Sequence, residues 1–598
     1  MPKSQDQSLT MRSSLRVEED EGWTKISMGS CSNLVPTPPG ELNGPASSEA
    51  SESESMQDRV VRVSADLGEI EKFYNIEGSP ARYARLTEFF KSELAALSDA
   101  PFASYSQDEK VDYILLKNFL HRSQRNLELD HGREAEFAPF VEPFAEPIWK
   151  WCEIRQRQRA DEVFEPQTLA DSLSKTCDAV SRSIAYVAEH GDEYSQATGS
   201  RAARRIRELR KHISETCDFY SGYHPSFDYW VASPRTALDA ALRKLEEQVR
   251  DAIIGGDGED TIVGEPIGRD GLIVELEAEM IPYSPEELLR IAEREYVWCE
   301  REMKAATLQL DYADWRDGLE YVKNLYEPPA THTSFVKELV AEGAAYVKGH
   351  DLVTVPRLAE EAITITRIPP AKQRVSPFFL GGRRLQISFP RVDMAHADKL
   401  MTLRGNNRHF SRATAFHEMI PGHRLQLYVG ERSRPYRARL FSTPFFVEGW
   451  ALYWEMVFWE RGDFFTTPED KIGSLFWRMH RCMRIIFSLS FHLGRITAEE
   501  CVELLVERVG HERSTAEGEV RRSLNGSYPP LYQAGYMLGA LQLVQLRREA
   551  LAGKFAEKEF HDRVLKANVM PIEMLRALLL EKELHEDFKA TWRFYGDV

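Results

Sequence analysis

The segment that decides how this chain is interpreted spans residues 414–423 and reads Thr-Ala-Phe-His-Glu-Met-Ile-Pro-Gly-His. It is close to the pattern H-E-x-x-H, in which two histidines on one helix face bind zinc and the glutamate acts as general base. Here, however, His423 follows His417 by six residues rather than four. On a regular helix the two side chains would point about 240° apart. The spacing therefore requires an interruption of the helix.

The residues between the histidines supply that interruption. Pro421 has no N–H for the carbonyl of His417, and its ring clashes with that carbonyl in a continuous helix. Gly422 tolerates the backbone conformation that a break requires. We therefore predict a broken or bulged helix that brings His417 and His423 to one metal ion, with Glu418 as the base. The alternative is an ordinary helix C-terminus whose polar residues lie on the surface.

A second segment, residues 444–455, embeds two carboxylates in the aromatic-rich run Pro-Phe-Phe-Val-Glu-Gly-Trp-Ala-Leu-Tyr-Trp-Glu. Burying a carboxylate there is costly unless it is paired or coordinates a cation. Glu448 and Glu455 are seven residues apart, which is two helical turns, so they share a face. A site with two histidines and one glutamate takes its acid from a second helix. We predict Glu448 as the ligand and Glu455 as the acid that orients a ligating histidine; a surface charge is the alternative for Glu455.

Together the two segments resemble the paired signatures of the family known as domain of unknown function 885. Residues 417–426 and 446–455 carry the resemblance, and a weaker likeness extends from about residue 64 to the C-terminus. That family is similar to all-helical zinc metallopeptidases with a deep channel. The resemblance implies a mainly α, two-lobed protein with a deep central channel, in which one zinc ion is held by His417, His423 and Glu448.

Three positions depart from the pattern of that family. Arg424 stands where the family has the second histidine of a doublet, Ser488 where an aspartate is usual, and Tyr532 where a glutamine is usual. The metal-binding positions match, whereas positions expected to face the substrate are altered. The departures indicate a divergent substrate, or a protein whose hydrolytic function has drifted.

The C-terminal part supplies further candidates for catalysis and binding. Arginines recur every third residue at 478, 481 and 484, so the helix near 475–492 is basic on one side. A guanidinium facing the metal would bind a substrate carboxylate or the oxyanion, and Tyr536 would donate its phenol proton to a tetrahedral intermediate. The predicted roles are catalytic for Arg484 and Tyr536, and substrate-binding for Arg481, His492 and Tyr532. For each residue, a purely structural role in helix packing is the alternative.

Length and composition limit the classes of protein. A chain of 598 residues exceeds one compact core, so we predict two lobes, at about 59–360 and 361–598. The formal net charge is −18, whereas nucleic-acid-binding proteins carry a concentration of basic residues. The seven scattered cysteines indicate reduced thiols. We recognise neither a secretory signal nor an apolar run that would span a membrane. We therefore predict a cytoplasmic protein with neither a nucleic acid nor a membrane as partner.

Secondary structure is predicted to be helical after an N-terminal tail. Residues 1–58 are rich in Ser, Glu, Pro and Gly, and we expect them to be disordered. Apolar residues recur at helical spacing in segments 82–97, 108–122, 166–189, 236–252, 285–308 and 335–347. Ser284 before Pro285 marks a helix start. Residues 362–368 and 384–389 read as strands of a small hairpin or edge ribbon.

These observations combine into one functional hypothesis. We predict a zinc-dependent hydrolase that cleaves an amide or peptide bond, with water activated by Glu418. Two alternatives remain. One is a metal-dependent tailoring enzyme that acts on a small amide in a biosynthetic pathway. The other is a non-catalytic helical binding protein, against which the intact Glu418 argues because a binding site needs no base.

Overall fold

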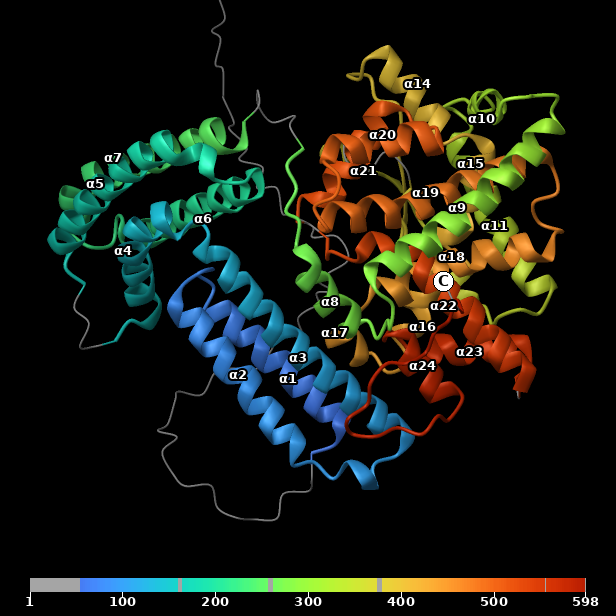
Figure 1. The fold of residues 1–598 in the computed structure, drawn as a ribbon, viewed down its shortest axis with the longest axis horizontal. Coiled ribbons are helices and arrows are strands. Elements are labelled where there is room, and N and C mark those ends of the chain that lie inside the picture. Colours follow the sequence, from blue (N-terminus) through green and yellow to red (C-terminus); the bar gives the residue numbers. More distant parts are fainter. Residues whose placement is uncertain are drawn as a thin grey trace, which may run out of the picture. The chain divides into compact units, whose positions relative to one another are not determined.

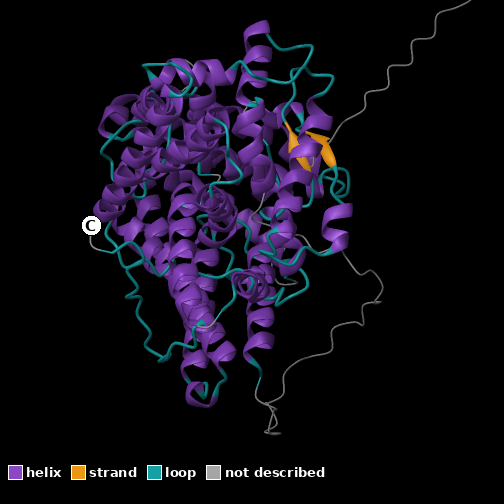
Figure 2. Cartoon of the chain, turned by 90° about the vertical axis from the view of Figure 1, so that its right-hand side faces the viewer, coloured by secondary structure: helices purple, strands orange, loops and turns teal. Residues whose placement is uncertain are grey.

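The computed structural model describes residues 54–159, 164–255, 262–373, 379–526, 528–553 and 555–596. The part of the predicted tail up to residue 53 lies outside this range, and the first helix begins at Met56. Helices account for most of the described chain, with two short strands at its margin (Figure 2). No helix among the described residues is both long enough and apolar enough to cross a membrane.

The N-terminal helices form two groups (Figure 1). Serine side chains cap the starts of α1, α2, α3 and α6 by accepting a backbone N–H. The first group contains α1 (Met56–Phe73), α2 (Pro80–Ser98) and α3 (Gln107–Ala135), with the short turn η1 (Phe102–Ser104). The second contains α4 (Ala138–Arg157), α5 (Pro166–His190), α6 (Gln196–Tyr220) and α7 (Phe227–Val249), with η2 (Gly191–Glu193) and η3 (Arg250–Ile254).

The remaining helices lead into the C-terminal half and build the candidate site. Those before the site are α8 (Gly268–Ala278), α9 (Pro285–Leu308), α10 (Trp315–Lys323), α11 (His332–Gly349), α12 (Arg357–Glu361), α13 (Pro370–Gln373) and α14 (His396–Gly405). Those that form and surround it are α15 (Arg408–Glu418), α16 (His423–Gly430), α17 (Arg437–Leu440), α18 (Pro444–Arg461), α19 (Pro468–His492), α20 (Ala498–Val509), α21 (Arg513–Leu524), α22 (Tyr532–Gly553), α23 (Glu557–Ala567) and α24 (Ile572–Leu579).

The predicted mainly α fold is confirmed, and the predicted helical segments lie within or overlap α2, α3, α5, α7, α9 and α11. The predicted start of α9 is also correct. Ser284 accepts the backbone N–H of Glu287, and the Glu287 side chain accepts the N–H of Ser284, which is a complete capping box.

The two predicted strands form a ribbon, but they do not form a hairpin. Strands β1 (Ile365–Arg367) and β2 (Leu385–Ile387) pair in parallel. Parallel pairing needs a crossover, and the connection that contains α13 is long enough to provide one. The hairpin alternative was therefore wrong. Local sequence indicated the strands, whereas their direction depends on the path of the connection.

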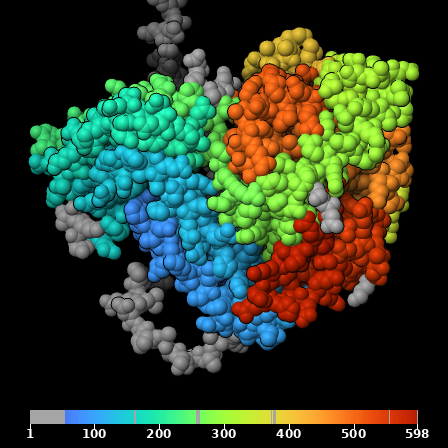
Figure 3. Space-filling model, in the orientation of Figure 1, coloured from blue at the N-terminus to red at the C-terminus, as the bar shows by residue number. Residues whose placement is uncertain are grey.

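Hydrophobic side chains gather in three clusters. The largest draws residues from α1–α3 and from α8 to the C-terminus. A second consists mainly of residues from α4–α7, and a small third joins α11, α15 and the ribbon. The largest cluster takes residues from both sides of position 360, and the proposed division into lobes there remains a prediction. The chain end returns to α9, where Arg593 pairs with Glu287, and Figure 3 shows these red and green segments directly against each other.

Helix α18 lies at the centre of the C-terminal half. It is apolar on all sides and buried over most of its length, as expected for a helix surrounded by others. It approaches α22 closely, since a Cβ added at Gly449 would lie 2.7 Å from the Cα of Gly539. Only glycine allows two backbones so near each other. This contact brings α22 against the helix that carries Glu448 and Glu455.

Candidate metal centre

The break between α15 and α16 sets the spacing of the two histidines. Helix α15 ends at Glu418, and α16 begins at His423. The N–H of Gly422 donates to the carbonyl of Phe416, at 3.0 Å and six residues back. A side chain at Gly422 would collide with the carbonyl of His417. The predicted broken helix is confirmed.

Helix α18 holds this break in place. The indole N–H of Trp450 donates to the carbonyl of Pro421 at 2.9 Å, and Gln426 donates to the carbonyl of Phe446 at 3.1 Å. A carbonyl freed at a broken helix needs a partner when it is buried. The tryptophan supplies that partner from two residues beyond Glu448 on the same helix.

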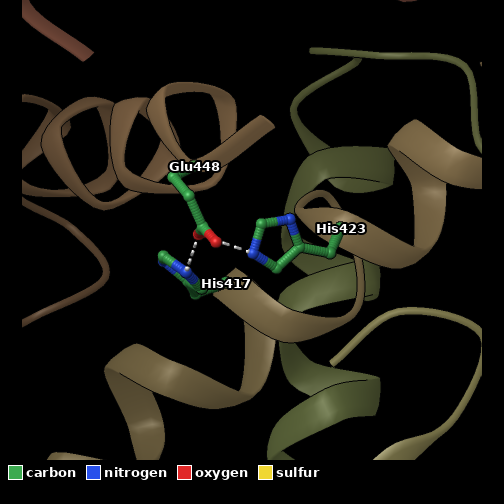
Figure 4. A group of neighbouring side chains, drawn as sticks. All are labelled: His417, His423 and Glu448. Carbon is green, nitrogen blue, oxygen red and sulfur yellow. Dashed lines mark ion pairs between the residues drawn. The ribbon is translucent and has the colours of Figure 1, made fainter. Parts of the chain in front are cut away.

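Two imidazoles and one carboxylate meet at this point (Figure 4). The Nε2 atoms of His423 and His417 lie 3.1 Å and 3.8 Å from Oε2 of Glu448. One donor atom from each of the three residues lies within 4.8 Å of the other two, and all three residues are buried. Among the described residues, this is the one group of His, Cys, Asp and Glu that meets the criteria for holding a metal ion.

A second carboxylate orients His417 from behind. Nδ1 of His417 donates to Oε1 of Glu455 at 2.7 Å, which turns Nε2 toward Glu448. Arg481 in turn donates to the same oxygen of Glu455 at 3.3 Å, and to the carbonyl of Trp477 at 3.2 Å. A carboxylate that fixes the ring of a ligating histidine is a common feature of metal sites. Arg481 is thus joined to the histidine through Glu455.

The local electrostatics attract positive charge. Burial opposes protonation of His417, but its hydrogen bonds with Glu448 and Glu455 raise its pKa to about 9. Burial also disfavours an ionised Glu448, yet His423 and His417 hold its pKa well below the usual range. Burial raises the pKa of Glu418, against the influence of His417 and His423. A carboxylate with a raised pKa is suited to accept a proton near neutral pH.

Glu418 lies at the partly open side of the group. It is half-buried, whereas His417 and His423 are 2% and 3% exposed. The turn that precedes β2 lies directly against it, since a side chain at Gly381 would overlap the Glu418 carboxylate. The ribbon therefore borders Glu418, while the three potential ligands face inward.

Helix α22 contributes two of the predicted residues to the same site. The hydroxyl of Tyr532 donates to Oε1 of Glu448. The ring of Tyr536 lies 6.4 Å from the ring of His417, between centroids. The guanidinium carbon of Arg484 lies 4.3 Å above the ring of Tyr536. Arg484 also donates from Nε to Glu519 at 2.7 Å, so its charge is balanced by a carboxylate.

The other singled-out residues lie further from the group. His492 is eight residues beyond Arg484, about 12 Å along α19, and its Nδ1 accepts the N–H of Ile267 at 3.4 Å. Burial, with a contribution from Arg133, lowers its pKa to about 4. Arg424 donates to the carbonyl of Ala359 at 3.2 Å, away from the histidines. The structure thus gathers eight of the ten predicted residues around α15, α18 and α22, and it places His492 elsewhere; Arg484 borders the group through Tyr536.

Sequence reasoning did not identify several residues that shape this site. Trp450 was recognised only as part of an aromatic run, although an indole two residues after a predicted ligand is a usable signal. Glu519 and Arg522, three residues apart on α21, and Tyr528 were not considered. Ser488, one of the altered positions, is buried, and its hydroxyl has no hydrogen-bond partner among the described residues. The sequence carries no signal that relates α21 to the histidine segment.

Comparison with known proteins agrees with this fold. The model of a family described as "Bacterial protein of unknown function (DUF885)" matches residues 75–579. The chain is similar to the structure of "a putative lipoprotein of unknown function from Shewanella oneidensis", with a TM-score of 0.63, 17% identity, and coverage of 88% of this chain and 100% of that chain. It is also similar to "the putative lipoprotein from Colwellia psychrerythraea", with a TM-score of 0.55, 17% identity, and coverage of 88% and 99%. A search of curated proteins finds no match. At this identity the similarities establish the helical fold alone.

Proposed function

The chain belongs to the DUF885 family, whose description assigns no reaction, and we propose from the site itself that it is a zinc-dependent hydrolase of an amide or peptide bond. One zinc ion would be held by His417, His423 and Glu448. Glu418 would transfer a proton from the attacking water to the leaving nitrogen. One observation carries the proposal: three buried donor groups converge within 4.8 Å beside a half-buried glutamate. A group of buried polar side chains with a purely structural role would not need a proton acceptor beside it.

The three donor groups fit zinc in kind and in spacing. Two ligand atoms on a tetrahedral zinc ion, each about 2.1 Å from the metal, lie roughly 3.4 Å apart. The separations of 3.1 Å and 3.8 Å from Glu448 to the two histidines lie on either side of that value. Two neutral imidazoles with one carboxylate form a common catalytic set, which leaves a position open for substrate or water. The hydrogen bond from His417 to Glu455 supports the same assignment.

The chemistry follows from the position of each side chain. A bound zinc ion would polarise a carbonyl group and lower the pKa of water toward 7. Glu418 would accept the proton of the attacking water and deliver it to the leaving nitrogen. The phenol of Tyr536 would donate to the oxyanion that forms on the carbonyl oxygen. Arg484, against its ring, would position Tyr536.

A small amide is the second candidate substrate, and the altered residue Tyr532 favours it. Its bulky ring replaces the family's glutamine, and its hydroxyl occupies an oxygen of Glu448. This ring narrows the space beside the three donor groups, which suits a compact substrate. Turnover of one small amide, with no turnover of general peptides, would distinguish this candidate. The cytoplasmic location and the absence of a nucleic-acid or membrane partner remain predictions.

The test begins with the metal and proceeds to the base. Protein purified without chelator should carry about one zinc per chain and should hydrolyse members of a peptide and amide panel. Glu418→Gln should keep the metal and lose hydrolysis by roughly 100-fold or more, the usual effect of removing a general base. Glu338→Gln, on the exposed face of α11, serves as the control.

Two outcomes would contradict the assignment. Protein that contains no metal and takes up none on zinc titration would exclude the site altogether. If Glu418→Gln lost its zinc, Glu418 would be a ligand, and the roles assigned to it and to Glu448 would have to be exchanged.

A further inference from the structure

Beyond Tyr532 the site continues into a group of residues to which the proposed reaction assigns no role. We infer that Arg522, flanked by Tyr528, binds a carboxylate of the substrate. The preferred substrates would then be short peptides or acylated amino acids whose free carboxylate lies close to the scissile bond. This inference rests on the proposed function for the identity of that bond.

Three neighbouring tyrosines, Tyr536, Tyr532 and Tyr528, lie between the three donor groups and Arg522. Tyr532 donates to Glu448, and its ring centroid lies 5.8 Å from that of Tyr536 and 4.4 Å from that of Tyr528. The guanidinium carbon of Arg522 lies 5.7 Å from the centroid of Tyr528. The aromatic faces thus lead from the scissile position to a cationic end.

Charge balance at this end favours an anion. Glu519 is shared by two guanidinium groups, with Nε of Arg484 at 2.7 Å and Nε of Arg522 at 2.9 Å. The nearby histidines do not alter this balance, because burial lowers the pKa of His511 to about 3 and that of His480 well below its usual value. Among the ion pairs of the described residues, one carboxylate therefore faces two permanent positive charges. A substrate carboxylate would restore neutrality.

Accessibility separates Arg522 from the other arginines of the site. The Arg481 and Arg484 side chains are 5% and 6% exposed. The Arg522 side chain is 15% exposed, and Tyr528 and Tyr532 beside it are half-buried. Of the three arginines, Arg522 is therefore the one most accessible to a ligand from solvent. A guanidinium can bind a carboxylate through two parallel hydrogen bonds, which gives both affinity and orientation.

The spacing limits the length of the substrate. From Tyr532, which touches Glu448, the path to Arg522 consists of two steps of 4.4 Å and 5.7 Å. An extended peptide advances about 3.3–3.6 Å per residue. A free carboxylate would reach Arg522 from a scissile bond no more than roughly three residues away. This geometry points to removal of short terminal fragments or to cleavage of small acylated amino acids.

The first experiment uses the zinc-loaded wild-type protein. N-acetylated di-, tri- and tetrapeptides would be supplied as matched pairs, each with a free C-terminal carboxylate or a C-terminal carboxamide. We expect kcat/KM to be about 10- to 100-fold higher for the acids, the range of a hydrogen-bonded charge. Equal rates for the members of each pair would overturn the inference and leave the proposed hydrolase function standing.

The second experiment removes the arginine. In Arg522→Gln the ratio of acid to amide kcat/KM should fall to about one, mainly through a higher KM for the acids. Arg522→Lys keeps the charge without the paired geometry and should give an intermediate ratio; it also serves if the glutamine variant fails to fold. Arg513→Gln is the control, because this residue lies on the same helix but pairs with Glu499 and Glu503 at the surface. An unchanged ratio in a folded Arg522 variant would overturn the inference.

A binding measurement separates failure of this inference from failure of the proposed function. Zinc-loaded Glu418→Gln protein would be titrated calorimetrically with the same acid and amide pairs. Tighter binding of the acids, lost in Glu418→Gln/Arg522→Gln, would support the carboxylate subsite even if the wild-type protein hydrolysed no member of the panel. Equal binding of acids and amides would overturn it, whatever the catalytic result.

Discussion

Two buried groups in this protein have the same composition, two histidines and a glutamate, yet their surroundings differ. In the first, His417 and His423 face Glu448, with Nε2 atoms 3.8 Å and 3.1 Å from one carboxylate oxygen. In the second, His511 and His480 hydrogen-bond to each other at 2.9 Å, and His480 lies 3.8 Å from Glu519. His417 lies at the end of α15, His423 at the start of α16 and Glu448 on α18, whereas His480 lies on α19, His511 in the connection between α20 and α21, and Glu519 on α21.

The two groups differ in the charged side chains that surround their histidines. Glu519 is bound by Arg484 and Arg522, so its oxygens are occupied and the local potential is positive. Burial lowers the pKa of His511 to about 3, with Lys323, Arg484 and Arg481 adding to this shift. The pKa of His417 is about 9, because its hydrogen bonds with Glu448 and Glu455 outweigh its burial. A place that favours a proton on imidazole also favours a metal cation. The same two residue types, two histidines with one glutamate, thus form a candidate metal centre in one setting and a structural network in the other.

The largest expected effect tests this contrast directly. His417→Ala should abolish zinc binding, a loss greater than the roughly 100-fold expected for an outer partner. His480→Ala should still bind about one zinc per chain, since the second group does not attract a cation. Metal analysis and zinc titration of both variants would decide. Zinc lost from His480→Ala, in a folded protein, would contradict the comparison.

The second prediction concerns stability and pH. The pKa of Glu519 is held at about 2, because Arg484 and Arg522 outweigh its burial. A carboxylate with a depressed pKa stabilises the fold at pH above its unfolded value near 4.5 and loses this contribution as the pH falls toward 2. Glu519→Gln should therefore lower the free energy of unfolding by about 3 kcal/mol at pH 7.

Chemical denaturation at several pH values would measure this effect. The difference between wild type and Glu519→Gln should shrink between pH 4.5 and pH 2, and the exposed Glu499→Gln should show no such trend. A difference that stayed constant across this window would mean that the charge of Glu519 does not stabilise the fold.

A third prediction addresses the carboxylate behind His417. Glu455→Gln keeps the size of the side chain but weakens its hold on Nδ1, so zinc affinity should fall by about 10- to 100-fold. Zinc competition against a chromophoric chelator would measure it. Glu460→Gln, on the same helix and 55% exposed, should bind zinc as the wild type does. Unchanged affinity in Glu455→Gln would show that packing alone orients the histidine.

The smallest expected effect involves Tyr532. Tyr532→Phe removes the hydrogen bond to Glu448 while keeping the ring, so zinc affinity should change by roughly three- to tenfold, about 1 kcal/mol. Tyr229→Phe, at an 82% exposed position on α7, is the matched control. The same competition assay applies, and a loss as large as that of His417→Ala would mean that Tyr532 is essential for forming the site.

Much of this architecture followed from local patterns. The boundaries of α9 and the start of α5 at Pro166 matched the predicted ones, because Pro at a helix start and apolar residues at helical spacing act within a few residues. The two strands were located correctly, and of the two alternatives only the hairpin, which implies antiparallel pairing, was wrong. Their pairing depends on a connection whose path no local pattern specifies.

In the candidate site, too, the local features were predictable from the sequence and the contacts between helices were not. The break at Pro421 and Gly422 was predictable, because a missing N–H and a missing side chain act on the helix that contains them. The hydrogen bond from Trp450 to Pro421 and the pairing of Arg484 with Glu519 were not. These contacts join separate helices, and a sequence pattern does not state which residue on another helix will face a given atom.

By itself, the sequence determined that this is a helical protein with a broken helix at residues 417–423 and two carboxylates on one face of a second helix. Periodicity, capping and the chemistry of proline act over a few residues, so they can be read without a structure. Only the tertiary structure decided that Glu448 meets both histidines and that Glu455 accepts a hydrogen bond from one of them. It also decided that Glu519 forms ion pairs with two arginines. Those partners come from helices far apart in the chain, and the packing of α15, α18, α19, α21 and α22 brings them together.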